Sequence, residues 1–291
     1  MKRVFRFMIV FLFLCFILIP LSVQAFGVAQ VDQAKVRLMI PPGSTKTGSI
    51  NVDNPTAEAK LIKAYLEDWV YLPVCDGTKD FKSAGSTELS AAPWISFFPS
   101  EFTIPPFGRQ ALNYSVKVPN NAQGGHYAVM FFENYMSDPN KATEGQVNVN
   151  VAIRVASLFY IEAEGTIRRE AKISDFEVKN SEGAKLQVSA KLDNIGNVDI
   201  STKSTFFILD KKGAVQARGE FNDVYTFPGD SVILTSSWKE PIPAGSYDLV
   251  FSVDLGRALE ELELGRGPVI TKEVQITIGP DGSVTNVGAL K

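Results

Sequence analysis

Short stretches of alternating apolar and polar residues cover most of this chain, and they constrain its fold more than any other feature. The clearest is VNVNVAIRV, in which five apolar residues share one face of an extended strand: Val147, Val149, Val151, Ile153 and Val155. A period of two residues is typical of a β-strand with one buried face. Turn signals such as PPG and NP separate the stretches. The sequence therefore predicts an all-β protein built from β-sandwiches.

The two halves of the chain repeat one order of motifs. VDNP in the first half corresponds to LDNI in the second, and GRQALNYSVKVPNNAQGGHYAVMFF corresponds to GDSVILTSSWKEPIPAGSYDLVF. The first half contains an additional segment between Leu72 and Pro93, which we interpret as an insertion. We predict two tandem Ig-like β-sandwich domains at residues 26–165 and 166–280, followed by a C-terminal tail at residues 281–291.

A Gly-x-Tyr motif precedes a hydrophobic strand in each half, as Gly125-His126-Tyr127 and Gly245-Ser246-Tyr247. In Ig-type sandwiches, a tyrosine at the corner that enters strand F forms a hydrogen bond to upstream backbone. We predict this structural role for four residues, because the glycine permits a tight turn and the tyrosine ring packs inside: Gly125, Tyr127, Gly245 and Tyr247.

The motifs that carry enzyme or metal chemistry are missing from the sequence. His126 is the only histidine, and Ser246 takes its place in the second half. A metal site needs several ligands, and a Ser-His-Asp or Cys-His site needs His126 itself. No phosphate-binding glycine loop and no nucleophile elbow is present. We predict no enzyme activity, no metal and no cofactor; an enzyme acting through paired carboxylates is the third of three hypotheses.

The N-terminus has the pattern of a cleaved signal peptide at residues 1–25. Three basic residues precede the apolar run FMIVFLFLCFILIPLSV, and Val23 and Ala25 supply the small residues of a cleavage site. No second apolar run is long enough to span a membrane. We therefore predict an exported protein, periplasmic or at the cell surface, with no membrane span in the mature chain.

The composition of the mature chain restricts its partners. Removing 25 of the 291 residues leaves 266, enough for two domains, and changes the net charge from −3 to −6 because three basic residues are lost. An acidic chain without basic runs argues against a nucleic-acid partner. Cys75 is the one cysteine left, so it is either buried and inert or paired with another chain.

Three stretches of the first half follow one order. RLMIPPGSTKTGSINVDNP has a first strand with an arginine, a proline-containing turn and an x-V-x-N strand. WISFFPSEFTIPPFGRQALNYSVKVP follows, and VNVNVAIRVASLFY alternates hydrophobic residues and ends in LFY. Over residues 31–163, these stretches resemble the opening, the middle stretch and strand G of PapD-like pilus-assembly chaperones.

This resemblance implies a function and a set of site residues. Strand G of that family lends alternate side chains to an incomplete pilus subunit, which implies that the apolar face from Val147 to Val155 binds a partner. Two basic residues at the domain cleft hold the terminal carboxylate of the subunit, and by position these are Arg37 and Arg154. Arg154 lies six residues before Tyr160, one more than the family's spacing. The alternative is that both arginines are surface residues and that the strand is paired within its own sheet.

The second half resembles Ig-like modules of bacterial surface proteins, through N-x-G-N-V, a D-x-x-G hairpin, P-G and G-x-Y. The tandem is also similar in outline to WxL-interacting envelope proteins. Two functions follow from these resemblances. The protein is a periplasmic chaperone that binds a pilus or envelope protein by strand donation, or it is an envelope module that binds a surface protein or a wall polymer. In the second case, the insertion around Cys75 and the loop from Leu255 to Gly267 are the expected contacts.

Overall fold

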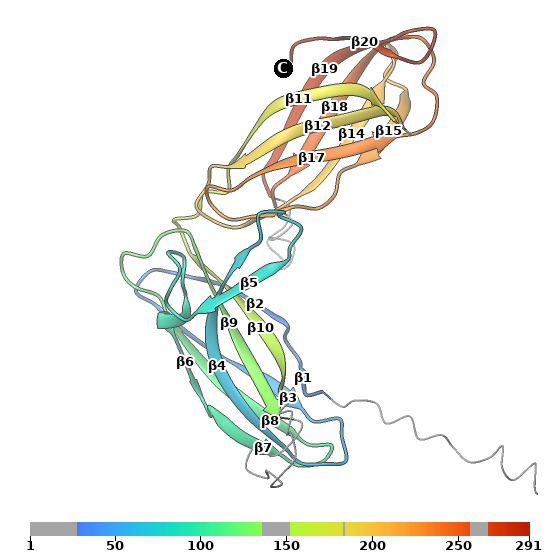
Figure 1. The fold of residues 1–291 in the computed structure, drawn as a ribbon. Helices are drawn as coiled ribbons and strands as arrows, with labels where there is room; N and C mark the ends of the chain where they lie inside the picture. The colour runs from blue at the N-terminus through green and yellow to red at the C-terminus, as the bar shows by residue number, and fades with distance from the viewer. Residues whose placement is uncertain (1–27, 136–151, 183, 257–266) are drawn as a thin grey trace, which may run out of the picture.

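The computed structural model describes residues 28–135, 152–182, 184–256 and 267–291. Within these ranges the chain forms two β-sandwiches that meet end to end (Figure 1), which confirms the predicted fold class. The predicted signal peptide lies outside the described residues. In the described ranges, no helix is long and apolar enough to cross a membrane.

The first sandwich packs two sheets against each other. One sheet has the order β1 (Gln30–Val31), β3 (Thr45–Asp53), β8 (Arg109–Lys117) and β6 (Ile95–Phe98). The other has the order β2 (Lys35–Ile40), β10 (Ala152–Ala163), β9 (Gly125–Tyr135), β4 (Lys60–Tyr71) and β5 (Lys79–Ser83), and β7 (Glu101–Ile104) also pairs with β4. A 3-10 helix (Ala92–Trp94) precedes β6. This is the ABED and GFC arrangement of Ig-like domains.

The second sandwich has a three-stranded and a five-stranded sheet. The smaller sheet has the order β11 (Ala171–Ser181), β12 (Ala184–Asn194) and β17 (Ser231–Trp238). The larger has the order β15 (Val215–Glu220), β14 (Lys203–Leu209), β18 (Gly245–Asp254), β19 (Val269–Ile278) and β20 (Val284–Val287). A further short pair is formed by β13 (Ile200–Ser201), which follows β12, and β16 (Tyr225–Thr226), which precedes β17. The predicted domain boundary at residues 165 and 166 falls in the connection from β10 to β11.

The segment predicted as a C-terminal tail belongs to the second sandwich. β20 pairs with β19, and the Lys291 N–H donates to the Glu273 carbonyl at 2.9 Å. The residues of β20 are mostly exposed. A strand with little buried surface has weak alternation, which explains why the sequence pattern did not reveal it.

One asparagine in each sandwich confirms the internal repeat. Asn54 and Asn194 are each 1% exposed. Each accepts a hydrogen bond on Oδ1 from the backbone N–H two residues later, and each donates from Nδ2 to the carbonyl four residues later. The VDNP and LDNI motifs therefore form the same turn, in which the side chain replaces a backbone partner.

Candidate functional site

One edge of β10 is paired along only half of its length. On one side, β9 pairs with β10 in antiparallel register from Ala152 to Glu162. On the other side, β2 pairs in parallel register from Leu158 to Ala163. From Ala152 to Ala156 no strand among the described residues pairs with this second edge. The first half of β10 is therefore an edge strand within the larger sheet of the first sandwich.

The backbone groups that face this open edge follow from the pairing with β2. The Leu158 N–H donates to the Ala34 carbonyl, and the Glu164 N–H donates to the Ile40 carbonyl, each at 3.0 Å. Backbone groups of successive residues in a strand point to opposite edges. Arg154 and Ala156 are an even number of residues from Leu158, so their N–H and C=O groups point away from β9. An edge of this kind is a template for another strand.

The two described residues of the predicted binding face point toward the core at this edge. Ile153 and Val155 are partly buried, and Val155 packs against the core of the first sandwich. Val147, Val149 and Val151 lie outside the described residues. The binding role of this face stays a prediction.

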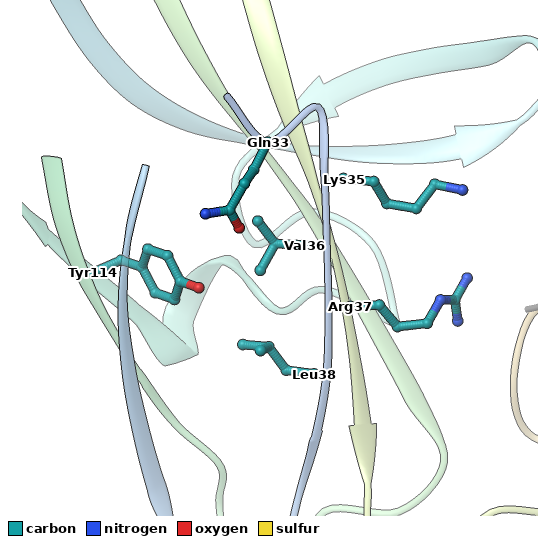
Figure 2. A pocket seen from close by; sticks show the side chains of 6 residues that line it. All are labelled: Gln33, Lys35, Val36, Arg37, Leu38 and Tyr114. Carbon is teal, nitrogen blue, oxygen red and sulfur yellow. The ribbon is translucent and has the colours of Figure 1, made fainter. Parts of the chain in front are cut away.

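A hollow of about 460 Å³ opens between β2 and β8. Figure 2 shows Val36, Leu38 and Tyr114 pointing into this space with Gln33 at its end, while Lys35 and Arg37 extend to the other side of β2. Ser157, the residue that follows the open half of β10, donates from Oγ to the Gln33 carbonyl at 2.6 Å. The hollow therefore begins next to the open edge, and apolar core side chains line it.

Arg37 is not a surface residue, so the alternative that both arginines lie at the surface is wrong for Arg37. Its side chain is 4% exposed and lies on the sheet face opposite the core, with the guanidinium carbon 4.2 Å from the centroid of the Tyr160 ring. It donates to both carboxylate oxygens of Asp199 in the second sandwich, at 3.1 and 3.0 Å. It also donates to Glu162 Oε1 at 2.9 Å. Burial alone lowers the pKa of Arg37, but the two carboxylates outweigh it and raise the pKa.

Arg37 belongs to an interdomain network of five residues: Arg37, Tyr127, Glu162, Arg169 and Asp199. Arg169 Nη2 donates to Glu162 Oε1 at 2.9 Å, and the Glu162 side chain is fully buried. Two arginines thus balance two carboxylates at the junction of the sandwiches. A partner's carboxylate at Arg37 must compete with Glu162 and Asp199, which already hold its guanidinium.

Arg154 and Arg37 do not form one carboxylate site. Tyr160 lies opposite Arg37 in the register, and Arg154 precedes Tyr160 by six residues in β10. At roughly 3.3 Å per residue, this separates the two by about 20 Å along the sheet. Arg154 instead pairs with Glu67 at 3.1 Å, and its guanidinium carbon lies 3.8 Å from the Phe131 ring centroid.

The two Gly-x-Tyr corners differ in the partner of the tyrosine. The Tyr247 hydroxyl donates to the Pro243 carbonyl at 2.7 Å, which is the predicted bond to upstream backbone. The Tyr127 hydroxyl accepts from the Asp199 N–H at 2.6 Å and donates to Asp199 Oδ1 at 3.3 Å. For Tyr127 the predicted upstream bond is wrong, because the second sandwich supplies the partner.

Aromatic rings extend the contact between the sandwiches. Trp69 is 1% exposed, and Phe227 from the second sandwich lies 5.1 Å from it and 4.3 Å from Tyr127, centroid to centroid. These rings belong to an interdomain aromatic cluster, which further includes Tyr71, Val129, Phe131 and Tyr160. The cluster buries apolar surface from both sandwiches and holds them together.

The insertion between Leu72 and Pro93 also joins the two sandwiches. Its strand β5 extends the larger sheet toward the second sandwich (Figure 1). The Tyr225 N–H donates to the Cys75 carbonyl at 2.8 Å, and Cys75 is 3% exposed. Burial raises the pKa of the Cys75 thiol. This part of the insertion is occupied by an internal contact, and most of the loop from Leu255 to Gly267 lies outside the described residues.

His126 packs against Trp94, with 4.1 Å between the ring centroids. Burial lowers the pKa of its imidazole below the usual 6.5. Within the described ranges, no three His, Cys, Asp or Glu side chains are placed to hold a metal ion.

The acidic half of the interdomain network was not predicted from the sequence. Glu162 stands in FYIEA, a charged residue inside an apolar run that ends a buried strand. Asp199 follows the turn that Asn194 forms. A charge within an apolar strand pattern indicates a buried ion pair, since an unpaired buried charge is costly. That signal identifies Glu162 but not its partners, which are distant in sequence.

No protein-family model and no curated protein matches the chain. Among solved structures, it is similar to the class 5 fimbriae chaperone CfaA, at 12% identity and a TM-score of 0.46, over 84% of this chain and 98% of that one. It is similar to the Pseudomonas aeruginosa CupB2 chaperone, at 13% identity and a TM-score of 0.39, over 84% and 98%. It is also similar to the Salmonella enterica SafA pilin in complex with the SafB chaperone, at 11% identity and a TM-score of 0.41, over 85% and 96%. Since these TM-scores lie below 0.5, the function proposed below depends on contacts within this chain.

Proposed function

We propose that this protein is a non-enzymatic, exported binding protein, and that it acts as a periplasmic chaperone for a pilus or surface subunit. It caps the subunit by lending it the open edge of β10. The observation that carries this proposal is the half-paired edge, where β2 covers residues 158–163 but not the residues before them.

Strand addition at this edge has two sources of binding free energy. The N–H and C=O groups of Arg154 and Ala156 pair with the backbone of the added strand, which is the usual basis of β-augmentation. The apolar face that includes Ile153 and Val155, with Val147, Val149 and Val151 before it, contributes side chains that a partner lacking a strand can bury. The hollow between β2 and β8 lies beside this edge and can take apolar side chains of the partner.

The second sandwich serves this function as a fixed support. Arg37 is held by Glu162 and Asp199, so in this proposal it sets the position of the second sandwich. The alternative of an envelope module with contacts through the insertion gains no support from the Cys75 region, because its backbone binds Tyr225.

Replacing Ala156 with proline tests the proposal at the backbone. The Ala156 N–H points away from β9, so proline removes an edge donor and blocks an added strand while the β9 pairing is kept. The Ala156→Val variant is the matched control, because valine has a similar size and retains the N–H. The assay is co-expression in the periplasm with candidate pilus or surface subunits, followed by co-purification.

We expect the wild-type protein and Ala156→Val to capture a subunit, and Ala156→Pro to lose at least about 90% of that capture with unchanged thermal unfolding. Equal capture by Ala156→Pro would contradict strand addition at this edge.

A further inference from the structure

The sheet on the other side of the first sandwich presents a second surface feature. A shallow hollow of about 650 Å³ lies over its outer face, across the central strands β3 and β8 and the edge strand β6. Lining residues alternate along each strand between the two faces of the sheet. Phe97 and Tyr114 pack on the core, so the side chains on either side of them in β6 and β8 point outward. β10 belongs to the opposite sheet, so this hollow is separate from the open edge.

The strand register arranges these side chains in two rows. In the first row Thr47 of β3 lies opposite Ser115 of β8, which lies opposite Ser96 of β6. In the second row, Ser49 lies opposite Asn113, which lies opposite Phe98. Neighbouring strands are about 4.8 Å apart and the rows are about 6.8 Å apart. Five small polar groups and one aromatic ring thus form a regular patch, which we call the outer-face patch.

The polar groups of the outer-face patch are available to a ligand. In the described part of the chain, the side chains of Thr47, Ser49, Asn113 and Ser115 make no hydrogen bond, and Ser96 Oγ makes a long one of 3.5 Å to the Ser115 carbonyl. The next outward residue of β3 differs, because Asn51 donates to Asp32 Oδ2 at 2.7 Å. The patch therefore ends where an internal partner begins.

Phe98 provides the apolar part of the same patch. Its side chain is 77% exposed, the highest exposure among the large hydrophobic residues of the described chain. An aromatic ring that is exposed beside unpaired hydroxyl and amide groups fits a ligand with both an apolar face and many hydroxyl groups.

The charge of the patch narrows the ligand class. No Asp, Glu, Lys or Arg lines the hollow. Anionic ligands such as phosphates or nucleic acids are normally held by basic groups, and a flat neutral surface offers none. Hydroxyl and amide side chains both donate and accept hydrogen bonds, which complements sugar hydroxyls. We infer that the outer-face patch binds a neutral oligosaccharide chain, with one sugar ring stacked on Phe98 and its neighbours bonded to the two polar rows.

Two exposed phenylalanines allow a matched test. Phe98 lies in the patch, whereas Phe107 is 74% exposed in the turn before β8 and does not line the hollow. The full mature chain and the variants Phe98→Ala and Phe107→Ala are titrated with maltohexaose, cellohexaose and chitohexaose, and binding is followed by calorimetry and by backbone amide shifts.

We expect at least one of the three sugars to bind, with amide shifts confined to residues 47–49, 96–98 and 113–115. Phe98→Ala weakens this binding at least about tenfold, which corresponds to 1.4 kcal/mol, and Phe107→Ala leaves it unchanged. Asn113→Ala causes a smaller loss. Thermal unfolding shows that the variants are folded. The inference is overturned if none of the sugars binds at millimolar concentration, or if both phenylalanine variants weaken binding equally. Subunit capture through β10 is unaffected by Phe98→Ala, so the two proposals fail separately.

Discussion

In the first sandwich, the tyrosine of the Gly-x-Tyr corner bonds to the other sandwich, whereas in the second sandwich it bonds within its own sandwich, four residues upstream. Tyr127 accepts a hydrogen bond from the Asp199 N–H, and Tyr247 donates to the Pro243 carbonyl. Both side chains are buried, so the rings satisfy the same packing requirement. The partner of the hydroxyl depends on what covers the corner.

The glycines before each tyrosine explain how the first corner is covered. Gly124 has a φ of +73°, and a Cβ at this residue would clash with the Asn197 carbonyl oxygen of the second sandwich. Gly125 donates its N–H to the same carbonyl at 2.9 Å. In the second half, Ala244 stands where the first half has Gly124. The additional glycine therefore marks the corner that another backbone approaches. One motif thus serves folding in the second domain and domain assembly in the first.

Replacing Asp199 with alanine tests the interdomain network most strongly. The variant removes the bidentate partner of Arg37 and leaves a buried guanidinium with one carboxylate fewer. We expect the free energy of unfolding of the linked domains to fall by about 3–5 kcal/mol. Asp193→Ala is the control, because Asp193 pairs with Lys191 on the surface, and we expect little change. Similar thermal unfolding of both variants would contradict a stabilising network at the junction.

Gly124→Ala tests the close approach of the two backbones. Left-handed φ strains any residue with a Cβ, and here the Cβ also meets the Asn197 carbonyl, so we expect a loss of about 2–4 kcal/mol in denaturant unfolding. A substitution at Gly229 separates the strain of a left-handed φ from the clash with Asn197. Its φ is +90°, and nothing lies within 4 Å of an added Cβ. Gly229→Ala should lose only about 1 kcal/mol. Equal losses would mean that the approach at Gly124 is not tight.

Removing the hydroxyl of each corner tyrosine tests directly whether the two corners differ. Tyr127→Phe leaves the buried Asp199 N–H without its acceptor, and we expect a loss of about 1–3 kcal/mol. Tyr247→Phe leaves a part-buried carbonyl, with a loss of about 1 kcal/mol. Only Tyr127→Phe should also broaden the distribution of interdomain angles, which small-angle X-ray scattering measures. A change of that distribution in Tyr247→Phe would break the distinction between the corners.

Much of the fold could be predicted because its signals are local. Alternation with a period of two residues predicts strands with one buried face, and the described halves form sandwiches around residues such as Ile50 and Phe251. The asparagine turns at Asn54 and Asn194 and the corner at Tyr247 use partners within a few residues. β20 was missed because its residues are mostly exposed and carry little alternation.

The candidate site could be predicted only in part. The pattern of β10 indicates an apolar face at Ile153 and Val155, but alternation is the same whether a strand edge is paired or open. Arg37 was identified as a site residue from its position in the first strand, but its burial was not. That burial depends on Glu162, which is 125 positions away in the sequence, and on Asp199, which is 162 positions away. Arg154 shares a sheet face with Arg37, and only the register shows that about 20 Å separates them.

Local sequence patterns are enough to establish that this chain forms two β-sandwiches of one kind, because burial of alternate residues and tight turns are properties of neighbouring residues. Tertiary contacts alone establish which corner tyrosine joins the domains, which arginine is buried and which half of β10 is paired on one edge only among the described residues. These outcomes depend on pairings between residues far apart in the chain, such as Tyr127 with Asp199. Short patterns that are alike can therefore have different partners, since the partner is chosen by the packing of whole sheets.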